Sequence, residues 1–256
     1  MKRFAIFMLA LFATVDSFGW GQKGHDIVAY IAECNLTPKA YRKVVAVLDG
    51  HSPVYYANWL DGASHTPEYA YNKTWHYANV DEGNTYHTQS RNKSGDVVQA
   101  VIEIVEKLKS GSLSPGQENI HLRMLIHLVG DMHCPMHAGR LSDRGGNSVK
   151  VKFFGKSQKL HSVWDSELVE SAHRWGYTEW QREIDRVSKR EKREIIAGSP
   201  LEWFEQTHAA AVEVYKHTPD GSKLSYDYVT RFTPMVEQQL LRGGVRLAHL
   251  LNEIYR

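Results

Sequence analysis

The stretch HLVGDMHCPMH, residues 127–137, says most about the architecture, because its first half fits a helix and a proline follows at once. We expect a helix over residues 118–133 that is broken by Pro135, which lacks the amide hydrogen that a helix interior requires. Apolar residues at helical spacing recur on both sides of this stretch. The further helices predicted by this spacing cover residues 24–34, a segment that begins at Thr37 and Pro38, 56–64, 96–108, 162–173, 177–188, 200–216 and 234–255.

β structure is expected in one place only. The alternating stretch VKVKFF at 149–154 predicts a strand, and Gly155 with Lys156 can turn it into a short hairpin. Residues 65–93 are rich in Tyr, Asn, His and Thr and are predicted to be mostly loop. The sequence therefore predicts a mainly α, single-domain helical bundle with a short β-hairpin.

The same stretch carries the strongest chemical signal. His127 and Asp131 are four residues apart, so they share one face of the predicted helix. His137 lies beyond the proline and can turn towards a second metal ion. His133 points elsewhere on the helix and is predicted to be structural or exposed.

A second His/Asp pair has the same spacing, in HSVWD at 161–165. Imidazole and carboxylate at this spacing match zinc coordination, although one such pair alone is usually only a helix-surface hydrogen bond. Two pairs and a third histidine together favour a metal site with His127, Asp131, His137, His161 and Asp165. Asp61 in ANWLDGA and His76 in TWHYANV are isolated, and each is either a buried polar group or a further ligand.

The amino-terminal segment predicts export. Residues 1–19 combine a positive start with a twelve-residue apolar stretch and small residues before Trp20, as secretory signals do. A membrane anchor or a buried helix is the alternative, but spanning a bilayer takes about 20 apolar residues. Cleavage before Trp20 would leave a domain of residues 20–256 in the periplasm or outside the cell. Its free amino group and carbonyl could bind a metal ion together with His25.

Composition narrows the function classes. The chain has 256 residues, a formal net charge of +2 and two cysteines, Cys34 and Cys134. These numbers exclude a disulfide-built scaffold and show no polybasic run typical of nucleic-acid binding. An anionic substrate must therefore be attracted by something other than a basic tract in the sequence.

Six motifs in order resemble the S1/P1 family of zinc-dependent nucleases. They are WGQKGH, NWLDGA, WHYAN, HLVGDMHCPMH, GGNSVKV and LHSVWD. The stretch QLLRGGVRLAHLLNEI also resembles the family's closing helix, so the resemblance covers the whole mature chain. The resemblance implies a fold of the phospholipase C/P1 nuclease type and a site for three zinc ions. It assigns nine ligands, of which Asp131 bridges two ions. The first ion takes Asp61, His76, His127 and Asp131; the second takes Trp20, His25 and Asp131; the third takes His137, His161 and Asp165.

The resemblance also implies the reaction. A zinc-activated water would attack the phosphodiester of single-stranded DNA or RNA and leave 5′-phosphate products, with Asp131 as the catalytic carboxylate and 3′-nucleotides as further substrates. Tyr77, Asn79 and Asn147 are the expected substrate-binding residues. Alternatively, Tyr77 is a core tyrosine, and the turn that contains Asn147 is only the entry to the hairpin. Cys134 stands where the family usually has glutamine, and we expect it to be a buried neighbour of the zinc rather than a ligand. No obligate protein partner is evident, and no membrane association is expected after cleavage.

Two other functions remain open on the sequence alone. A zinc-dependent phospholipase C resembles this family in its amino-terminal tryptophan and three zinc ions. A non-enzymatic exported zinc-binding protein would also use such ligands, although it would favour closed coordination shells.

Overall fold

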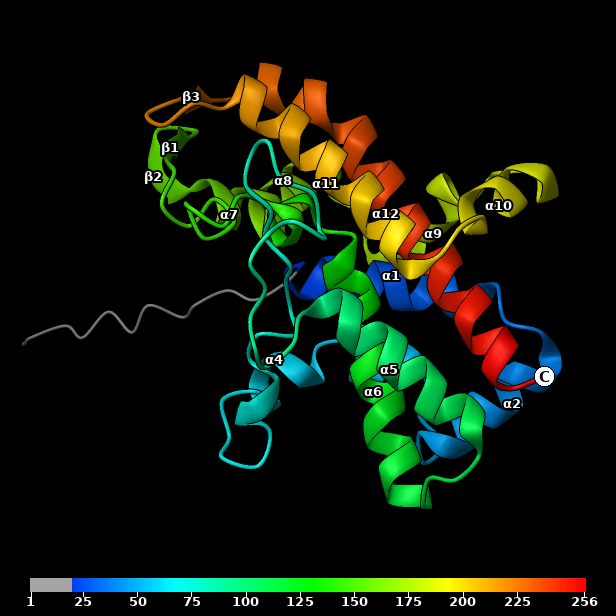
Figure 1. The fold of residues 1–256 in the computed structure, drawn as a ribbon. Coiled ribbons are helices and arrows are strands. Elements are labelled where there is room, and N and C mark those ends of the chain that lie inside the picture. Colours follow the sequence, from blue (N-terminus) through cyan, green and yellow to red (C-terminus); the bar gives the residue numbers. More distant parts are fainter. Residues whose placement is uncertain (1–19) are drawn as a thin grey trace, which may run out of the picture.

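The structure, a computed structural model, describes residues 20–256, so the predicted signal segment 1–19 lies outside the described residues. The described chain is a helical bundle with a small sheet at one end (Figure 1). The long carboxy-terminal helix α12 (Tyr226–Ile254) packs against α1 (Gln22–Cys34) and α6 (Pro115–Met132). The prediction of a mainly α fold is confirmed. No helix within residues 20–256 has the length and apolarity to cross a bilayer.

Local sequence signals explain where these helices begin. Thr37 caps α2 (Pro38–Val47) by accepting a hydrogen bond from the amide of Ala40, and Pro38 takes the first helical position, where no amide is needed. Asp96 caps α5 (Val97–Ser110) in the same way. Ser114 and Gln117 form a reciprocal capping box at the start of α6.

The bundle is tightest where α12 crosses α1. A side-chain carbon added at Gly244 would lie 2.4 Å from Ile31, and one added at Gly243 would lie 3.2 Å from Val28. Glycine at these positions lets the two backbones approach closely. This contact holds α1, and with it His25, against the core.

The structure corrects several predicted helix boundaries. The helix expected over 56–64 is two short helices, α3 (Pro53–Tyr56) and α4 (Trp59–Ala63). The helix expected over 162–173 consists of three parts: α7 (Leu160–Ser162), a π-helical stretch (Val163–Glu167) and α8 (Leu168–Ala172). The helix expected over 177–188 ends earlier, as α9 (Tyr177–Ile184), whereas α11 (Pro200–His217) matches the expectation.

Two helical segments were not predicted from the sequence. α10 (Lys189–Ile196) has a capping box, but its sequence KREKREII has apolar residues only at its end, so no repeating apolar stripe indicates a helix. α12 begins at Tyr226 and continues through Pro234, eight residues before the predicted start at 234. The remaining short elements are 3₁₀ turns at Ala70–Asn72 and Pro135–Ala138.

The predicted hairpin forms part of a three-stranded sheet. β1 (Lys150–Phe153) pairs antiparallel with β2 (Lys156–Lys159) through a turn in which Phe154 and Gly155 have positive φ. β3 (Lys223–Leu224) adds a parallel edge on the other side of β1, which the sequence did not predict.

Candidate metal centre

Five separate segments bring the eight predicted histidine and aspartate ligands together in the core of the bundle. His25 lies on α1, Asp61 on α4 and His76 in the loop that follows; His127 and Asp131 lie on α6, and His137 lies in the 3₁₀ turn after it, with His161 and Asp165 on α7 and the π-helical stretch. Seven of the eight residues are buried. The side chain of Asp61 is 31% exposed, whereas those of Asp131 and Asp165 are fully buried, so solvent reaches the centre from the side of Asp61.

Asp131 occupies the middle of this cluster, and its two oxygens face different partners. Oδ1 lies 3.3 Å from Nε2 of His25. Oδ2 lies 2.9 Å from Nδ1 of His76 and 3.2 Å from Nε2 of His127. A carboxylate with one oxygen on each side can bridge two cations, whereas a neutral imidazole cannot. This is the geometry expected for the shared ligand.

The atoms around Oδ2 have the spacing of a zinc coordination shell. Nε2 of His127 lies 3.2 Å from both Nδ1 of His76 and Oδ1 of Asp61, and the last two atoms are 3.9 Å apart. Four donors placed tetrahedrally around zinc at about 2.0–2.1 Å are about 3.3 Å from one another. The predicted set of Asp61, His76, His127 and Asp131 therefore matches one tetrahedral ion in distance as well as in residue type.

Hydrogen bonds on the outer side of the rings fix which nitrogen faces inward. The Nδ1 atoms of His127, His137 and His161 each donate to a backbone carbonyl, at 2.8, 2.6 and 2.6 Å. His76 uses its other nitrogen, because Nε2 donates to Ser64 Oγ at 3.0 Å while that hydroxyl donates to Asn72. When a ring is neutral, its inward nitrogen is then the lone-pair donor, as metal-binding histidines require.

Four atoms that point into the cluster are buried without a hydrogen-bond partner within residues 20–256. They are Nε2 of His25, Oδ1 of Asp61, Oδ1 of Asp131 and Oδ2 of Asp165. Leaving buried polar atoms unsatisfied is costly, and here electron-pair donors face other electron-pair donors. Cations between them remove both problems, so the residues fit a multi-metal centre.

The charges of the cluster are strongly coupled. Burial raises the pKa of Asp131, but His127 and His137 outweigh that effect and hold the pKa well below its ordinary value. Burial likewise lowers the pKa of His127, but the carboxylates of Asp131 and Asp61 raise it well above the ordinary value. The carboxylates are thus ionised at neutral pH, which metal binding needs.

A third group of donors lies beside the first two. Oδ2 of Asp165 lies 3.1 Å from Nε2 of His161, and Oδ1 lies 3.8 Å from Nε2 of His137. The π-helical stretch carries Asp165, and π-helical turns are often found at functional sites. Cys134 belongs to this group as well: its thiol is buried and donates to Oδ1 of Asp165 at 3.5 Å. Both cysteines are free.

Trp20 lies next to this third group. Its side chain is buried and packs against Gly24, where an added side-chain carbon would lie 2.7 Å from that of Trp20. The amide of the following residue, Gly21, donates to the carbonyl of Asp165 at 2.6 Å. The backbone at Trp20 is therefore tied to the centre. The expected cut before it falls on the boundary with residues outside the described part of the chain.

The predicted substrate-binding residues are divided by the structure. Tyr77 and Asn79 line a cavity of about 280 Å³ together with Tyr86, Arg91 and Leu141. Asn147 does not line it, because its amide donates to the carbonyl of Arg144 within its own turn. No pattern in the sequence pointed to Tyr86 and Arg91, whose aromatic and cationic side chains add to this cavity.

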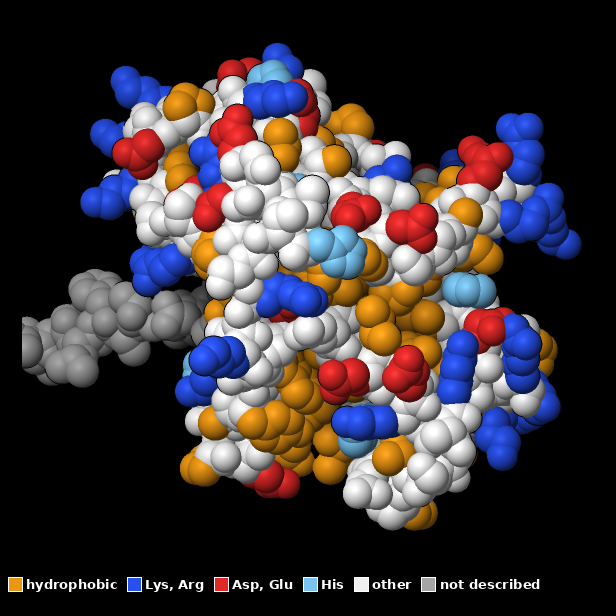
Figure 2. All heavy atoms as spheres, in the orientation of Figure 1, with side chains coloured by type: hydrophobic (Ala, Val, Ile, Leu, Met, Phe, Trp, Pro, Cys, Tyr) orange, Lys and Arg blue, Asp and Glu red, His pale blue; other side chains and the backbone are white. Residues whose placement is uncertain are grey.

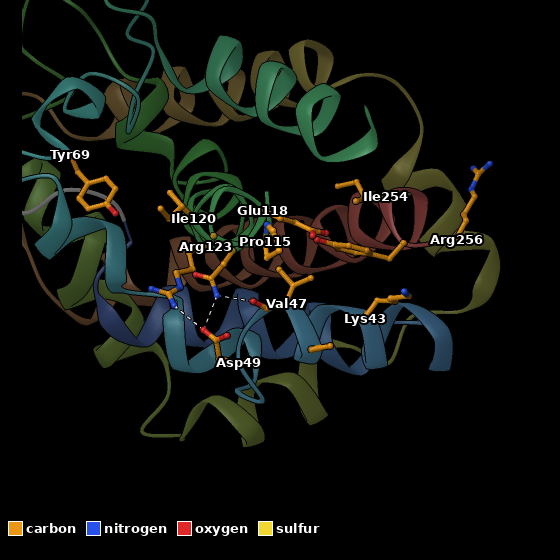
Figure 3. Close-up of a pocket in the computed structure, with 14 residues that line it drawn as sticks. Lys43, Val47, Asp49, Tyr69, Pro115, Glu118, Ile120, Arg123, Ile254 and Arg256 are labelled. Carbon is orange, nitrogen blue, oxygen red and sulfur yellow. Dashed lines mark hydrogen bonds and ion pairs between the residues drawn. The ribbon is translucent and has the colours of Figure 1, made fainter. Parts of the chain in front are cut away.

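A larger cavity of about 800 Å³ lies at the opposite end of α6, about 24 Å along the helix from Asp131 (Figure 3). None of the predicted ligands lines it. Its charged side chains partly satisfy one another, since Asp49 accepts from Asn119 and pairs with Arg123. The cavity is therefore separate from the metal centre.

His133 has a structural role, which is one of the two alternatives predicted for it. It is fully buried, its Nδ1 donates to the carbonyl of Val129, and its Nε2 accepts from Arg246 on α12 at 2.9 Å. This network holds the turn after α6, which positions His137.

Comparison with known proteins identifies the family of the chain. The family model for S1/P1 nuclease matches residues 20–256. Endonuclease 2 of Arabidopsis thaliana is 28% identical over 96% of this chain and 93% of its own length. Nuclease P1 of Penicillium citrinum is 26% identical over 92% of this chain and 98% of its own, and nuclease S1 of Aspergillus oryzae is 24% identical over 93% and 92%.

Proposed function

The chain belongs to the S1/P1 nuclease family over residues 20–256, and on that basis we propose that it is a zinc-dependent endonuclease specific for single strands. It would hydrolyse phosphodiester bonds of DNA and RNA to 5′-phosphate products, and it would also accept 3′-nucleotides. The observation that carries the proposal is Asp131, whose two oxygens face His25 on one side and His76 with His127 on the other. A protein that only stored zinc would need neither a carboxylate shared by two ions nor a metal centre that is partly open to solvent.

The chain would hold three zinc ions in the sets that the resemblance implies. Asp61, His76, His127 and Asp131 hold the first ion, and Asp131 shares the second with His25 and the amino group of Trp20. His137, His161 and Asp165 hold the third. When bound, zinc supplies Lewis acidity that lowers the pKa of a water and stabilises charge on the phosphate.

The protein's own contribution is to fix these ligands and to exclude water elsewhere. Backbone carbonyls hold three imidazole rings in one tautomer, so no rearrangement of the rings is needed when substrate arrives. With Asp61 at the solvent side, an exposed phosphate can approach the centre while Asp131 stays sealed.

The adjoining cavity supports recognition of a base. Tyr77 is half-buried and can stack on any base, which contributes about 1–3 kcal/mol and tolerates different sequences. Asn79 offers an amide to the base edge. A base reaches a recessed cavity of this kind only after leaving a stack, and the free-energy cost of leaving is smallest in an unpaired strand. Single strands should therefore be preferred over duplexes.

Export and accurate processing belong to the same proposal. Residues 1–19 would be removed during export to the periplasm or the medium, and the new amino group of Trp20 would complete the second zinc set. A chain that retains Gly19 would have an amide nitrogen there, which is a poor ligand. It should contain less zinc and be weakly active.

The test uses the chain that begins at Trp20, loaded with zinc, on single-stranded DNA, duplex DNA and phosphatidylcholine. We expect rapid cleavage of the single strand, slow cleavage of the duplex, no lipid turnover, and loss of activity with a chelator. Lipid turnover without nucleic-acid turnover would make it a phospholipase C. Inactivity on all three with full zinc content would leave a zinc-binding protein.

A further inference from the structure

The small sheet presents a row of lysines on its outer face. Val151 and Phe153 of β1 are buried, so the alternate residues Lys150 and Lys152 point away from the core. The register places Lys159 of β2 opposite Lys150, and Lys223 of β3 opposite Lys152. These four lysines are called the lysine face below.

The arrangement is electrostatically unfavourable in the protein alone. Lysines directly opposite each other on neighbouring strands repel. Within residues 20–256, no ion pair involves any of the four lysines. The nearby carboxylate of Asp220 accepts a hydrogen bond from the backbone amide of Lys150 at 2.6 Å. The charge of the lysine face is therefore left for a ligand.

Protection of sheet edges explains only part of the pattern. Lysines on edge strands prevent pairing with other chains. Lys150 and Lys152, however, lie on β1, which is the central strand of the sheet. Two of the four charges are thus not at an edge.

One strand of the lysine face, β2, runs into the segment that carries the third group of metal ligands. Lys159 precedes His161 by two residues, a span of at most about 7 Å between their Cα atoms. The turn that leads into β1 also contacts this ligand, because the carbonyl of Gly145 accepts from Nδ1 of His161 at 2.6 Å. A chain of phosphates that leaves the metal centre on this side would meet the sheet next.

A second basic surface, over α10, lacks these properties. Figure 2 shows Lys and Arg side chains gathered over β1 to β3 and again over the protruding helix α10. On and beside α10, basic residues have acidic partners: Arg190 pairs with Glu194, and Lys192 with Asp185. Two of its four basic residues are thus paired with acidic ones, and the helix lies in a different part of the bundle from the sheet (Figure 1).

We propose that the lysine face binds the backbone phosphates of the single strand on one side of the scissile bond, as an electrostatic extension of the metal centre. The proposal rests on the nuclease function above and adds how a polynucleotide is held. It explains how a chain of net charge +2 without a basic run can grip a polyanion. The lysines meet phosphates, so they carry no base preference.

The test compares the double variants K152Q/K223Q and K150Q/K159Q with the control K39Q/K43Q. The control removes the same charge from exposed lysines on α2, which lies at the opposite end of the molecule from the sheet. Binding of a fluorescent single-stranded phosphorothioate oligonucleotide, whose backbone resists hydrolysis, to zinc-loaded protein is measured against salt, so the readout does not depend on activity. Each lysine that no longer neutralises a phosphate should reduce the slope of log affinity against log salt by about 0.7, or about 1.4 for a pair. The control should keep the wild-type slope.

Activity gives the second readout. With zinc-loaded protein, kcat/KM on the oligonucleotide should fall several-fold at low salt in the two sheet variants, while hydrolysis of a 3′-nucleotide stays within about twofold of wild type. Unchanged slopes in both sheet variants, or equal losses in K39Q/K43Q, would overturn the proposal. Loss of binding to phosphatidylserine vesicles with oligonucleotide binding intact would assign the face to a membrane and also overturn it. If wild type cleaves neither substrate, the nuclease proposal fails, and the binding slopes still decide the role of the lysine face.

Discussion

Replacing Asp131 with Asn should remove two metal ions, not one. The amide keeps the size of the side chain but loses its charge and one of its two metal-facing oxygens. Because Oδ1 faces His25 and Oδ2 faces His76 and His127, both sides of the shared position are affected. Asp165→Asn is the matched control, since Asp165 belongs to the third group alone.

Electrostatics sets the scale of the effect. At an effective dielectric constant of about 20, two divalent ions about 4 Å apart repel by roughly 17 kcal/mol. A bridging carboxylate with half its charge on each oxygen, about 2 Å from the nearer ion and about 4 Å from the other, offsets this with roughly 25 kcal/mol of attraction. Without that charge, the two ions cannot both remain bound, and the remaining set keeps only one carboxylate, Asp61, so it holds even one ion weakly.

The assay is zinc content by mass spectrometry after dialysis, paired with cleavage of single-stranded DNA. Wild type should hold about three ions per chain, Asp131→Asn about one and Asp165→Asn about two. Both variants should lose most activity, and circular dichroism should confirm that they are folded. Equal zinc losses in the two variants would refute the shared role of Asp131, as would full zinc content in Asp131→Asn.

Three further outcomes rest on the same geometry. Burial lowers the pKa of His127, but Asp131 and Asp61 hold it well above the ordinary value. A proton therefore competes with zinc above pH ~6.5, and zinc affinity should weaken steadily from pH 8 to 6. Zinc titrations in chelator buffers measure this affinity, and an affinity that does not change with pH would contradict the prediction. Cys134→Ala should leave zinc content unchanged, because the thiol donates to Asp165; a sulfur-to-cobalt charge-transfer band in cobalt-loaded wild type, absent from the variant, would instead make Cys134 a ligand. Burial and Arg246 hold the pKa of His133 at about 3, so the unfolded chain binds one more proton than the folded chain below pH ~6.5, and the free energy of unfolding falls as the pH falls. His133→Gln should reduce the slope of this free energy against pH, measured by urea unfolding, by up to about 1.4 kcal/mol per pH unit. Equal slopes for wild type and variant would refute the assignment.

The helices that the sequence predicts well are those with local signals. Thr37 with Pro38 marks the start of α2, and the apolar spacing after Asp96 marks α5. Features set by distant contacts could not be predicted. β3 is two residues long and exists through parallel pairing with β1, some seventy residues away in the chain. The early start of α12 at Tyr226 was hidden by Pro234, which normally argues against a helix interior.

The metal centre likewise contains some ligands that local sequence spacing predicts and others that it does not. The pairs His127 with Asp131 and His161 with Asp165 follow from spacing alone, because four residues make one helical turn. Asp61 has no such local partner, and its assignment needed the family resemblance.

The sequence does not show which side chains from distant segments meet in the folded protein. The thiol of Cys134 donating to Asp165 and the alignment of four lysines on one sheet face depend on tertiary packing and strand register. In the sequence these lysines are spread over residues 150–223 and form no basic run.

Whether Asp131 bridges two zinc ions can be seen in a crystal of the chain that begins at Trp20, grown with zinc and measured at the zinc absorption edge. We predict three anomalous peaks: two on either side of the Asp131 carboxylate, each bound to a different oxygen, and one between His137, His161 and Asp165. A single peak at Asp131, or an Asp131 carboxylate in contact with only one ion, would contradict the bridging role.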